Sequence, residues 1–589
     1  MSTAAAFCEA GLQHFREGRH LDARTCYQQA LTIDAQHTDA QHLMGLLHLE
    51  ARQYNDALEW IVRAIRRAPK PEYLASFATV LQRHGRCDEA LNVLDKAIQL
   101  RRDGAGLWCQ RGDILIQLAR LDQALTSYQH ALELDPQHHD ALFKSGILLH
   151  KLGRNEEALA RLDESDRLFP DHAPTLRTRA WVLYGLKQFE ESATEGARAH
   201  RLDPGNADIC NNLGLALRRL RRNDEALAWF EKAIALAPRF ADAFDNKLVA
   251  LFHLHRFDEL FALSGRMMSL GLSNEVTAWN VSLAHLLTGN FEAGWLGHQT
   301  RSKLPSSRYP RFPQPTWLGD ESLKGKTILI AADEGLGDTI HFARYIPLLA
   351  ARGARVLLAV QDPLHRLMSD LGGASLCVPM SAMGTLPDFD LHCPISSLPL
   401  AFKTRLDTIP SGPYLPSPPA SRVQAWDCSL GPRTRLRVGL VWSGDPSHVN
   451  DETRSIPLRT LSRILDVDAS FISLQKAPRP SDAMVLRERS DIIDLTADLA
   501  DFTETAALIA CLDLVITVDT SVAHLAGALG CPTWILLPWT PDYRWLLDRA
   551  DSPWYPSVRL FRQTETRDYE SVLDRVRDDL LALTDAFGA

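Results

Sequence analysis

The sequence predicts an α + α/β protein, in which an N-terminal array of helical repeats is followed by an α/β region of two lobes. In the first half, a small residue that is alanine at all but one position recurs at steps of 33 or 34 residues. These signature positions are Ala23, Ala57, Ala90, Ala124, Ala158, Ser192 and Ala226. In the second half, short β-branched runs alternate with amphipathic stretches, which is typical of a parallel sheet covered by helices. With 589 residues the chain exceeds what one core usually organises.

Small residues and prolines accompany each signature position in the first half. A small residue stands twelve positions earlier, at Gly11, Gly45, Ala78, Gly112, Gly146, Ala180 and Gly214. Prolines recur at 34-residue steps, at Pro136, Pro170, Pro204 and Pro238. Small residues let two antiparallel helices approach closely, and proline ends the second helix before the next unit begins.

This step and pattern resemble tetratricopeptide repeats. We assign residues 1–300 to the array and include two fainter units around Phe257 and Phe291. The resemblance implies an α-solenoid whose groove holds a segment of another protein. A polypeptide partner is therefore expected, without any chemistry from the array itself.

The remaining chain divides at two proline-rich stretches. Residues 301–325 are predicted to be a linker, and residues 326–410 a first lobe with strands over 326–332 and 355–360. Residues 411–435 are predicted to link the lobes. The second lobe, 436–589, carries expected strands over 437–444, 470–476, 513–520 and 533–538 and ends in a helix. In such folds ligands bind beyond the carboxyl ends of the strands.

The composition excludes several classes of protein. A formal charge of −9 argues against non-specific nucleic-acid binding, and the ten cysteines show no metal-ligand spacing. No apolar run is long enough for a membrane span, and no signal peptide opens the chain. We expect a cytoplasmic protein with reduced thiols and no membrane span.

Two motifs in the α/β region carry the candidate chemistry. Gly335 and Gly337 form a tight loop after the first expected strand, and Asp338 opens the following helix in EGLGDTIHFARYIPLLAARGA. In DLVITVDTSVAHLAGALG, Asp519, Thr520 and Ser521 lie between a strand and a helix. Backbone N–H groups and hydroxyls at such a helix start suit a phosphate or diphosphate, although they also serve as a helix cap.

The two motifs, in this order and in separate lobes, resemble the heptosyltransferase-like GT-B glycosyltransferases. Repeats joined to such lobes also resemble the O-GlcNAc transferases and the bacterial flagellin glycosyltransferases, which modify proteins. The resemblance implies a GT-B fold of two Rossmann-like lobes, with Asp338 as the general base that takes the proton of the acceptor hydroxyl. A helix N-cap is the alternative role of Asp338.

Two histidines follow these motifs. His341 lies one turn beyond Asp338 and either orients the acceptor or faces the core of the lobe. His524 matches the histidine of the family and is expected to face the phosphates or the donor sugar. A packed histidine on the helix is the alternative for His524.

Other donor-binding candidates lie in the second lobe. Ser443 and Gly444 end an expected strand, and the polar loop after them runs to Arg454, where relatives place a basic residue against phosphate. Lys476 is a second candidate for the donor charge, and a surface ion pair is the alternative for both cations. The stretch 542–556 is rich in aromatic residues and contains Trp545 and Trp554, and Trp539 lies just before it. These aromatic side chains have three alternative roles: they stack on a nucleobase, cover the cleft or pack within the lobe.

No metal site and no cofactor are expected beyond the nucleotide-sugar substrate. Asp388 and Asp390 form an Asp-x-Asp pair, which the GT-A enzymes use for a divalent cation, but here it lies in an irregular loop. The GT-B enzymes instead offset the charge of the leaving group with helix N-termini and basic side chains.

Three functions fit the sequence. The favoured one is an inverting glycosyltransferase that moves a sugar from a nucleotide sugar to hydroxyls of an acceptor protein, flagellin-like and bound by the repeats. The second transfers the sugar to a lipopolysaccharide or another glycan. The third is a protein-binding scaffold with an inactive α/β region. UDP-GlcNAc, ADP-heptose and CMP-nonulosonate all remain possible donors.

Overall fold

The computed structural model describes residues 3–304, 309–448 and 450–588. These residues form two compact units that divide between Lys247 and Leu248. The division lies before the expected boundary at residue 300, because the last helices of the array pack with the α/β region.

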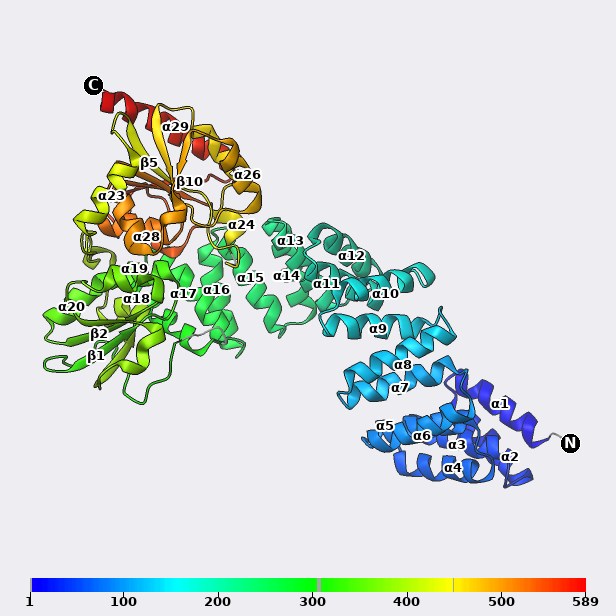
Figure 1. Ribbon diagram of the computed structural model, residues 1–589. Helices are drawn as coiled ribbons and strands as arrows, with labels where there is room; N and C mark the ends of the chain where they lie inside the picture. Colours follow the sequence, from blue (N-terminus) through cyan, green and yellow to red (C-terminus); the bar gives the residue numbers. More distant parts are fainter. Residues whose placement is uncertain (1–2, 305–308, 449, 589) are drawn as a thin grey trace. The chain divides into compact units, whose positions relative to one another are not determined.

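The first unit is a helical solenoid whose helices follow one another as packed pairs (Figure 1). Its helices are α1 (Ala4–Arg16), α2 (His20–Ile33), α3 (Thr38–Glu50), α4 (Tyr54–Arg67), α5 (Pro71–Arg83), α6 (Cys87–Leu100), α7 (Ala105–Gln117), α8 (Leu121–Leu134), α9 (His139–Lys151), α10 (Asn155–Leu168), α11 (Ala173–Gly185), α12 (Phe189–Leu202), α13 (Ala207–Arg219) and α14 (Asn223–Leu236). Helix α15 (Ala241–His253) crosses the division between the units.

The recurring small residues hold each helix pair together, as predicted. A Cβ at Gly112 would lie 2.5 Å from the ring of Tyr128, and one at Gly214 would lie 2.5 Å from the ring of Phe230. The signature residues are buried between the helices, and the alanines among them have no exposed surface. The prolines at 136, 170, 204 and 238 each follow the end of a second helix by two residues. The predicted tetratricopeptide solenoid is therefore confirmed.

The second unit begins with the last helices of the array. These are α16 (Phe257–Ser269), α17 (Glu275–Leu287) and α18 (Phe291–His298), followed by the short 3₁₀ helix η1 (Gln299–Lys303). Trp295 of α18 is 1% exposed, and its ring lies 6.2 Å from Phe342 and 6.4 Å from Trp554. The fainter repeats thus share a core with both lobes of the α/β region.

The first lobe contains a parallel sheet of described strands β1 (Thr327–Ala331), β2 (Arg355–Val360), β3 (Ala374–Pro379) and β4 (Leu391–Pro394) in the order β3-β2-β1-β4. The helices are α19 (Leu336–Phe342), α20 (Ile346–Ala351), α21 (Asp362–Met368) and α22 (Leu398–Ala401). Strand β1 is almost entirely buried, as expected for a strand with helices on both faces.

The second lobe contains a larger parallel sheet with the order β10-β9-β8-β5-β6-β7. Its strands are β5 (Leu436–Val441), β6 (Ala469–Ser473), β7 (Ile492–Asp494), β8 (Leu514–Val518), β9 (Thr533–Leu537) and β10 (Val558–Arg562). The helices are α24 (Asp451–Arg454), α25 (Leu458–Leu461), α26 (Pro480–Glu488), α27 (Phe502–Ile509), α28 (Ser521–Leu529) and α29 (Glu570–Gly588). The predicted parallel α/β architecture is confirmed.

Both predicted linkers contain ordered structure. Residues 411–435 include helix α23 (Ala420–Leu430), whose Trp426 donates an indole hydrogen bond of 3.0 Å to Glu504 of α27. In the stretch 301–325, Trp317 is buried, and its backbone N–H donates to the carbonyl of His392 at 2.8 Å. Residues 305–308 lie outside the described residues. The prolines therefore shape segments that pack onto the lobes.

Candidate active site

The predicted motifs lie where the strand order of each sheet reverses. Strand β1 has β2 on one side and β4 on the other, and the loop after it carries Asp338. Strand β5 has β8 on one side and β6 on the other, and β5 and β8 lead into Ser443 and Asp519. Connections diverge at such points and leave room for a ligand beyond the carboxyl ends of the strands.

The two motifs meet at this edge, because α19 of the first lobe packs beside α28 of the second lobe (Figure 1). A Cβ at Gly337 would lie 2.9 Å from Cδ2 of His524 and 3.5 Å from Cα of Ser521. Only glycine leaves room for this approach. The structure thus brings Gly337, which directly precedes Asp338, next to Ser521 and His524.

Replacing Gly337 by alanine is expected to destabilise the closed arrangement of the lobes. The added methyl group overlaps the packed imidazole of His524, a type of overpacking that typically costs about 1–3 kcal/mol. Thermal unfolding of Gly337→Ala and of Gly372→Ala measures this effect, since a Cβ at Gly372 meets no atom within 4 Å. Equal melting temperatures of the two variants would contradict the close approach.

Asp338 is held at both carboxylate oxygens. Its Oδ2 accepts a hydrogen bond of 2.8 Å from the N–H of Gly335, and its Oδ1 forms an ion pair with Arg544 of the second lobe. The side chain remains 22% exposed. The N-cap of α19 is Gly335 and not Asp338, as the alternative from the sequence had it; Asp338 is the third helical residue and accepts from the N–H of Gly335 in a capping box, with a carboxylate that stays partly exposed.

Arg544 is a residue of the site that the sequence analysis missed. It is 6% exposed, and its guanidinium also donates to Oδ1 of Asp542 at 2.8 Å and lies 4.3 Å from the ring centre of Tyr543. Arg544 stands in the aromatic stretch 542–556, directly after Asp542 and Tyr543, and this Asp-Tyr-Arg sequence is the local signal for it.

His341 is fully buried, and its ring lies against His524 and Trp554 of the second lobe, so it lies between the lobes and neither of the two expected alternatives holds in full. Its Nδ1 lies 2.9 Å from the hydroxyl of Tyr555, which also lies 3.0 Å from Nδ1 of His524. Burial lowers the pKa of both histidines well below the usual value, so both are neutral. With no exposed surface, His341 cannot touch an acceptor directly, and its predicted catalytic place is corrected to a buried link between the lobes.

His524 is packed rather than open. It is 5% exposed, and its ring stacks on Trp545 at a centroid distance of 5.3 Å. Trp545 and Trp554 have no exposed surface, which identifies them as packing residues. Trp539 stacks on His255 at 4.5 Å.

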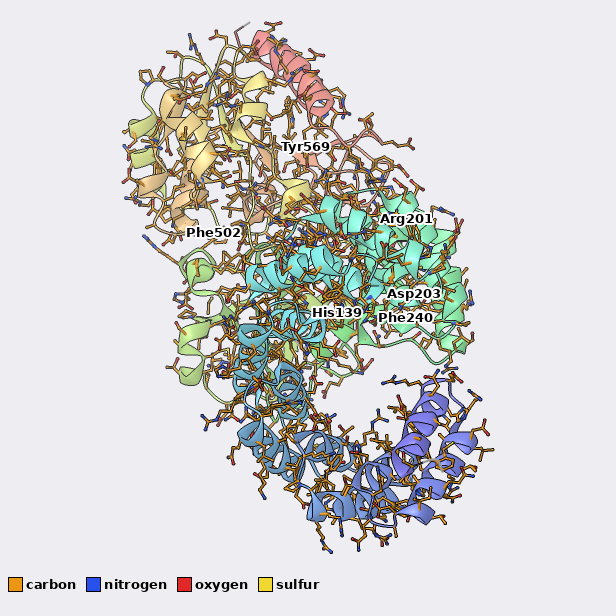
Figure 2. All side chains as sticks on the ribbon, turned by 90° about the vertical axis from the view of Figure 1, so that its right-hand side faces the viewer. His139, Arg201, Asp203, Phe240, Phe502 and Tyr569 are labelled. Carbon is orange, nitrogen blue, oxygen red and sulfur yellow. The ribbon has the colours of Figure 1, made fainter. Side chains whose placement is uncertain are left out.

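The predicted donor residues at the ends of β5 and β8 form one cluster. Nη1 of Arg454 donates to the carbonyl of Asp519 at 3.1 Å, and a Cβ at Gly444 would lie 2.5 Å from this guanidinium. Ser443 is 3% exposed, and its Oγ has no partner among the described residues. Tyr569, labelled in Figure 2, steadies α24 by donating to the carbonyl of Thr453 at 3.1 Å.

Thr520 is the N-cap of α28, and its side chain makes no capping hydrogen bond. Thr520 and Ser521, at the start of α28, are partly exposed. Burial and the neighbouring Asp542 raise the pKa of Asp519 to about 7. An anion that binds at the N-terminus of α28 would lie near the carboxyl group of Asp519. Because this carboxyl group takes up a proton near pH 7, it would repel the anion less than a permanently charged carboxylate.

Lys476 lies at the end of β6, and its ammonium donates to the carbonyl of Ala500 at 3.3 Å. It is exposed, and the structure shows no contact that joins it to Arg454 or Asp519 in the described part of the chain.

Within the described ranges, no group of three or more histidine, cysteine or acidic side chains is placed to hold a metal ion. Of the Asp-x-Asp pair, Asp390 accepts a hydrogen bond of 2.7 Å from the N–H of Thr327 and fixes the start of β1. No helix in the described part of the chain has the length and apolarity to cross a membrane.

A separate cavity of about 610 Å³ lies in the second unit and contains none of the predicted site residues. Its lining includes Phe257, Leu287, Leu406, Leu546 and Asp548. It borders the segment that carries Arg544, and its lining also includes Arg549 and Asp551.

Models of known protein families match segments in both halves of the chain. Residues 485–571 match glycosyltransferase family 9 (heptosyltransferase). Tetratricopeptide repeat families match residues 14–78, 112–153 and 207–240. The glycosyltransferase match includes the motif around Asp519 and His524 and supports glycosyl transfer.

Individual relatives cover parts of the chain. It is 27% identical over 323 residues to Protein FlbA of Caulobacter vibrioides, an alignment that covers 49% of this chain and 52% of that protein. The chain thus spans about half the length of this curated relative. Among solved structures, YrrB, a TPR protein with an unusual peptide-binding site, covers 32% of this chain and 97% of its own, with 23% identity and a TM-score of 0.30. PilF of Pseudomonas aeruginosa covers 35% of this chain and 94% of its own, with 20% identity and a TM-score of 0.33. The chain therefore combines tetratricopeptide repeats with a domain of glycosyltransferase family 9 (heptosyltransferase).

Proposed function

We propose that this protein is an inverting glycosyltransferase of the GT-B type that moves a sugar from a nucleotide sugar to a hydroxyl group of an acceptor protein. The observation that carries the proposal is the meeting of the Gly335–Asp338 loop with the N-terminus of α28 at the carboxyl ends of β1, β5 and β8. The proposal is supported by a partly exposed carboxylate of one lobe near the N-terminus of a helix of the other, where an anion would bind.

The reaction would be a single displacement at the anomeric carbon. The acceptor oxygen forms the new bond to this carbon while Asp338 takes its proton. The bond from the anomeric carbon to the phosphate oxygen breaks, and the nucleotide leaves with the electron pair. The N–H groups of α28 and the Arg454 guanidinium would stabilise the charge on the leaving phosphate without a metal ion.

The repeats support a protein acceptor. The first helices of successive repeats carry a polar, partly exposed side chain at 34-residue steps, at His42, Ser76, Gln110, Lys144, Thr178, Asn212 and Asn246. A regular row of hydrogen-bonding groups suits the backbone of an extended polypeptide. An acceptor of the flagellin type is the specific form of this proposal.

The two alternatives remain distinguishable. Transfer to a lipopolysaccharide or another glycan would use the same lobes without the row of polar groups. An inactive scaffold would bind protein through the repeats but no nucleotide sugar through the lobes.

A thermal-shift screen with UDP, ADP, GDP and CMP tests the donor site and identifies the nucleotide. A ligand that binds the folded state stabilises it by mass action, by about 2.7 kcal/mol at 100 times the dissociation constant. No shift with any nucleotide or its sugar conjugates would favour the scaffold.

Arg454→Ala is expected to weaken binding of the nucleotide sugar more than binding of the bare nucleoside. The guanidinium is placed to pair with phosphate, and a charge-assisted hydrogen bond of this kind contributes about 1.5–3 kcal/mol, or roughly 10- to 150-fold in affinity. Calorimetric titration measures both ligands. Arg459→Ala, an exposed neighbour, is the control. An equal loss for nucleoside and nucleotide sugar would contradict a phosphate contact.

A further inference from the structure

A second carboxyl group, Glu334, lies four residues before Asp338 in the same loop. Its Oε2 is buried and has no hydrogen-bond partner among the described residues, while the side chain as a whole is 23% exposed. The backbone is fixed, because the carbonyl of Glu334 accepts a hydrogen bond of 2.9 Å from Nε2 of Gln361. The loop backbone at Glu334 is thus anchored, and its side chain is partly exposed, with one buried carboxylate oxygen that lacks a partner among the described residues.

Helix α18 and η1 supply an oriented imidazole to this carboxyl group. His298 is 1% exposed, and its Nδ1 lies 3.1 Å from Nη1 of Arg301. A guanidinium is only a donor, so Nδ1 of His298 must accept and the proton of the neutral ring lies on Nε2. This Nε2 lies 3.9 Å from Oε1 of Glu334.

Arg301 is itself fixed by two further groups. Its Nε donates to Oδ2 of Asp333 at 2.9 Å, and its Nη2 donates to Oγ of Ser397 at 2.7 Å. The orientation of His298 is therefore set by a buried cation whose position does not depend on solvent. Such support is typical of groups that must present one atom to a substrate.

A third polar group at this place lacks a partner. Tyr543 is 5% exposed, its hydroxyl makes no hydrogen bond within the described residues, and its ring lies 5.8 Å from that of His298. Tyr543 directly precedes Arg544, the ion-pair partner of Asp338. Unpaired buried polar groups are rare because each costs about 1–3 kcal/mol. Their gathering beside Asp338 indicates a place that a polar substrate group completes.

We propose that Glu334 and Asp338 form a carboxylate pair that binds the acceptor hydroxyl and takes up its proton, with His298 and Tyr543 lining this acceptor subsite. The proposal rests on the proposed glycosyl transfer and identifies its acceptor side. As the acceptor oxygen bonds to the anomeric carbon, its O–H bond breaks and the proton comes to rest on the pair. The nucleotide leaves with the electrons of the broken carbon–oxygen bond.

The charges that face Glu334 explain why it suits this task. Burial and the negative charge of Asp338 raise the pKa of Glu334 to about 7, with Asp333 acting in the same sense and Arg301 and Arg544 opposing it. Burial lowers the pKa of His298 and raises that of Tyr543, so these two neighbours stay neutral. A base is most effective when its pKa lies near the working pH.

The sign of the pH dependence follows from this value. Above pH 7 Glu334 is a carboxylate that accepts the proton, and below pH 7 it is already protonated. The kcat of sugar transfer is therefore expected to fall as the pH drops through about 7. Stability changes in the opposite sense, because the folded state binds this proton more tightly than the unfolded chain does and loses that advantage as the pH rises from about 4.5 to 7.

Glu334→Gln in the full-length protein tests the proposal. At pH 8 its kcat is expected to fall about 10²-fold, the lower end for a group that takes up a proton, while the KM for the donor changes by no more than a few-fold. The fall of kcat near pH 7 should disappear. Glu334→Asp should keep that fall, and the exposed Glu488→Gln is the control. Raising the pH from 5 to 8 should lower the melting temperature of the wild type more than that of Glu334→Gln.

Two results would overturn the proposal. One is a Glu334→Gln variant with the kcat and the pH profile of the wild type. The other is a folded Glu334→Asp variant whose kcat no longer depends on pH near 7. A wild-type protein that binds no nucleotide sugar is a different failure, since it removes the proposed function itself.

Discussion

Asp338→Asn is expected to lower the rate of sugar transfer by about 10²- to 10⁴-fold, the usual loss when a general base is removed. Asparagine is close to isosteric and still accepts the hydrogen bond from the N–H of Gly335, but it cannot take up a proton. Because Asp338 belongs to the first lobe, binding of the nucleotide sugar should change by a few-fold at most. Single-turnover transfer and calorimetric titration measure the two effects separately.

The control for this prediction is Asp320→Asn, an exposed carboxylate outside the site. A folded Asp338→Asn variant with near-normal turnover would remove the proposed base. A variant that instead melts far below the wild type would show that the ion pair with Arg544 is mainly structural. In that case Glu334 would remain the only carboxyl group of the proposed pair.

Removal of the first repeats is expected to abolish modification of the protein acceptor while leaving nucleotide-sugar binding intact. A chain beginning at Arg239 keeps α15, which crosses the division between the units, and α16 to α18 of the second unit, and it lacks the row of polar groups from His42 to Asn212. A tethered recognition surface raises the effective concentration of the acceptor at the site. Mass spectrometry of the acceptor and titration with the donor give the two readouts.

A start at Arg311, which the sequence alone would suggest, removes His298, Arg301 and Trp295. These residues are buried against the lobes, so such a chain would lose part of the site and part of the core. A chain beginning at Gly104 retains most repeats and should keep intermediate activity, because each repeat contacts mainly its neighbours.

The double variant Thr178→Ala/Asn212→Ala tests the polar row without truncation. Circular dichroism must first show that each variant is folded.

Unchanged modification of the acceptor by the chain that starts at Arg239 would contradict the role of the repeats and favour a glycan acceptor.

The local features of the fold were predictable from the sequence. The repeat boundaries follow from glycines that meet a large ring or side chain of the partner helix, as Gly112 meets Tyr128, and from prolines that end helices. The buried strands β1, β2, β5, β6, β8 and β9 appear as β-branched runs. Strands β3, β4, β7 and β10 were not predicted, because β4 and β7 are short and the sequences of β3 and β10 carry weaker β-branched runs.

The parts of the site that depend on tertiary contacts were not predictable. Arg544 pairs with Asp338 across 206 positions in the sequence, and Arg301 reaches Ser397 across 96. Contacts between residues so far apart in the sequence cannot be predicted from local sequence patterns. Asp338 and the motif around Asp519 could be identified because strand, loop and helix place them by local sequence alone, whereas the burial of His341 depends on the packing of the second lobe.

Sugar transfer to an acceptor protein is measured most directly by the intact mass of purified flagellin after incubation with the protein and the nucleotide sugar that the thermal-shift screen selects. We expect a mass increase of one sugar residue for each modified hydroxyl group, with almost no increase for Asp338→Asn in the same time. An unchanged flagellin mass, with the sugar transferred instead to a lipopolysaccharide acceptor in a parallel reaction, would contradict transfer to protein.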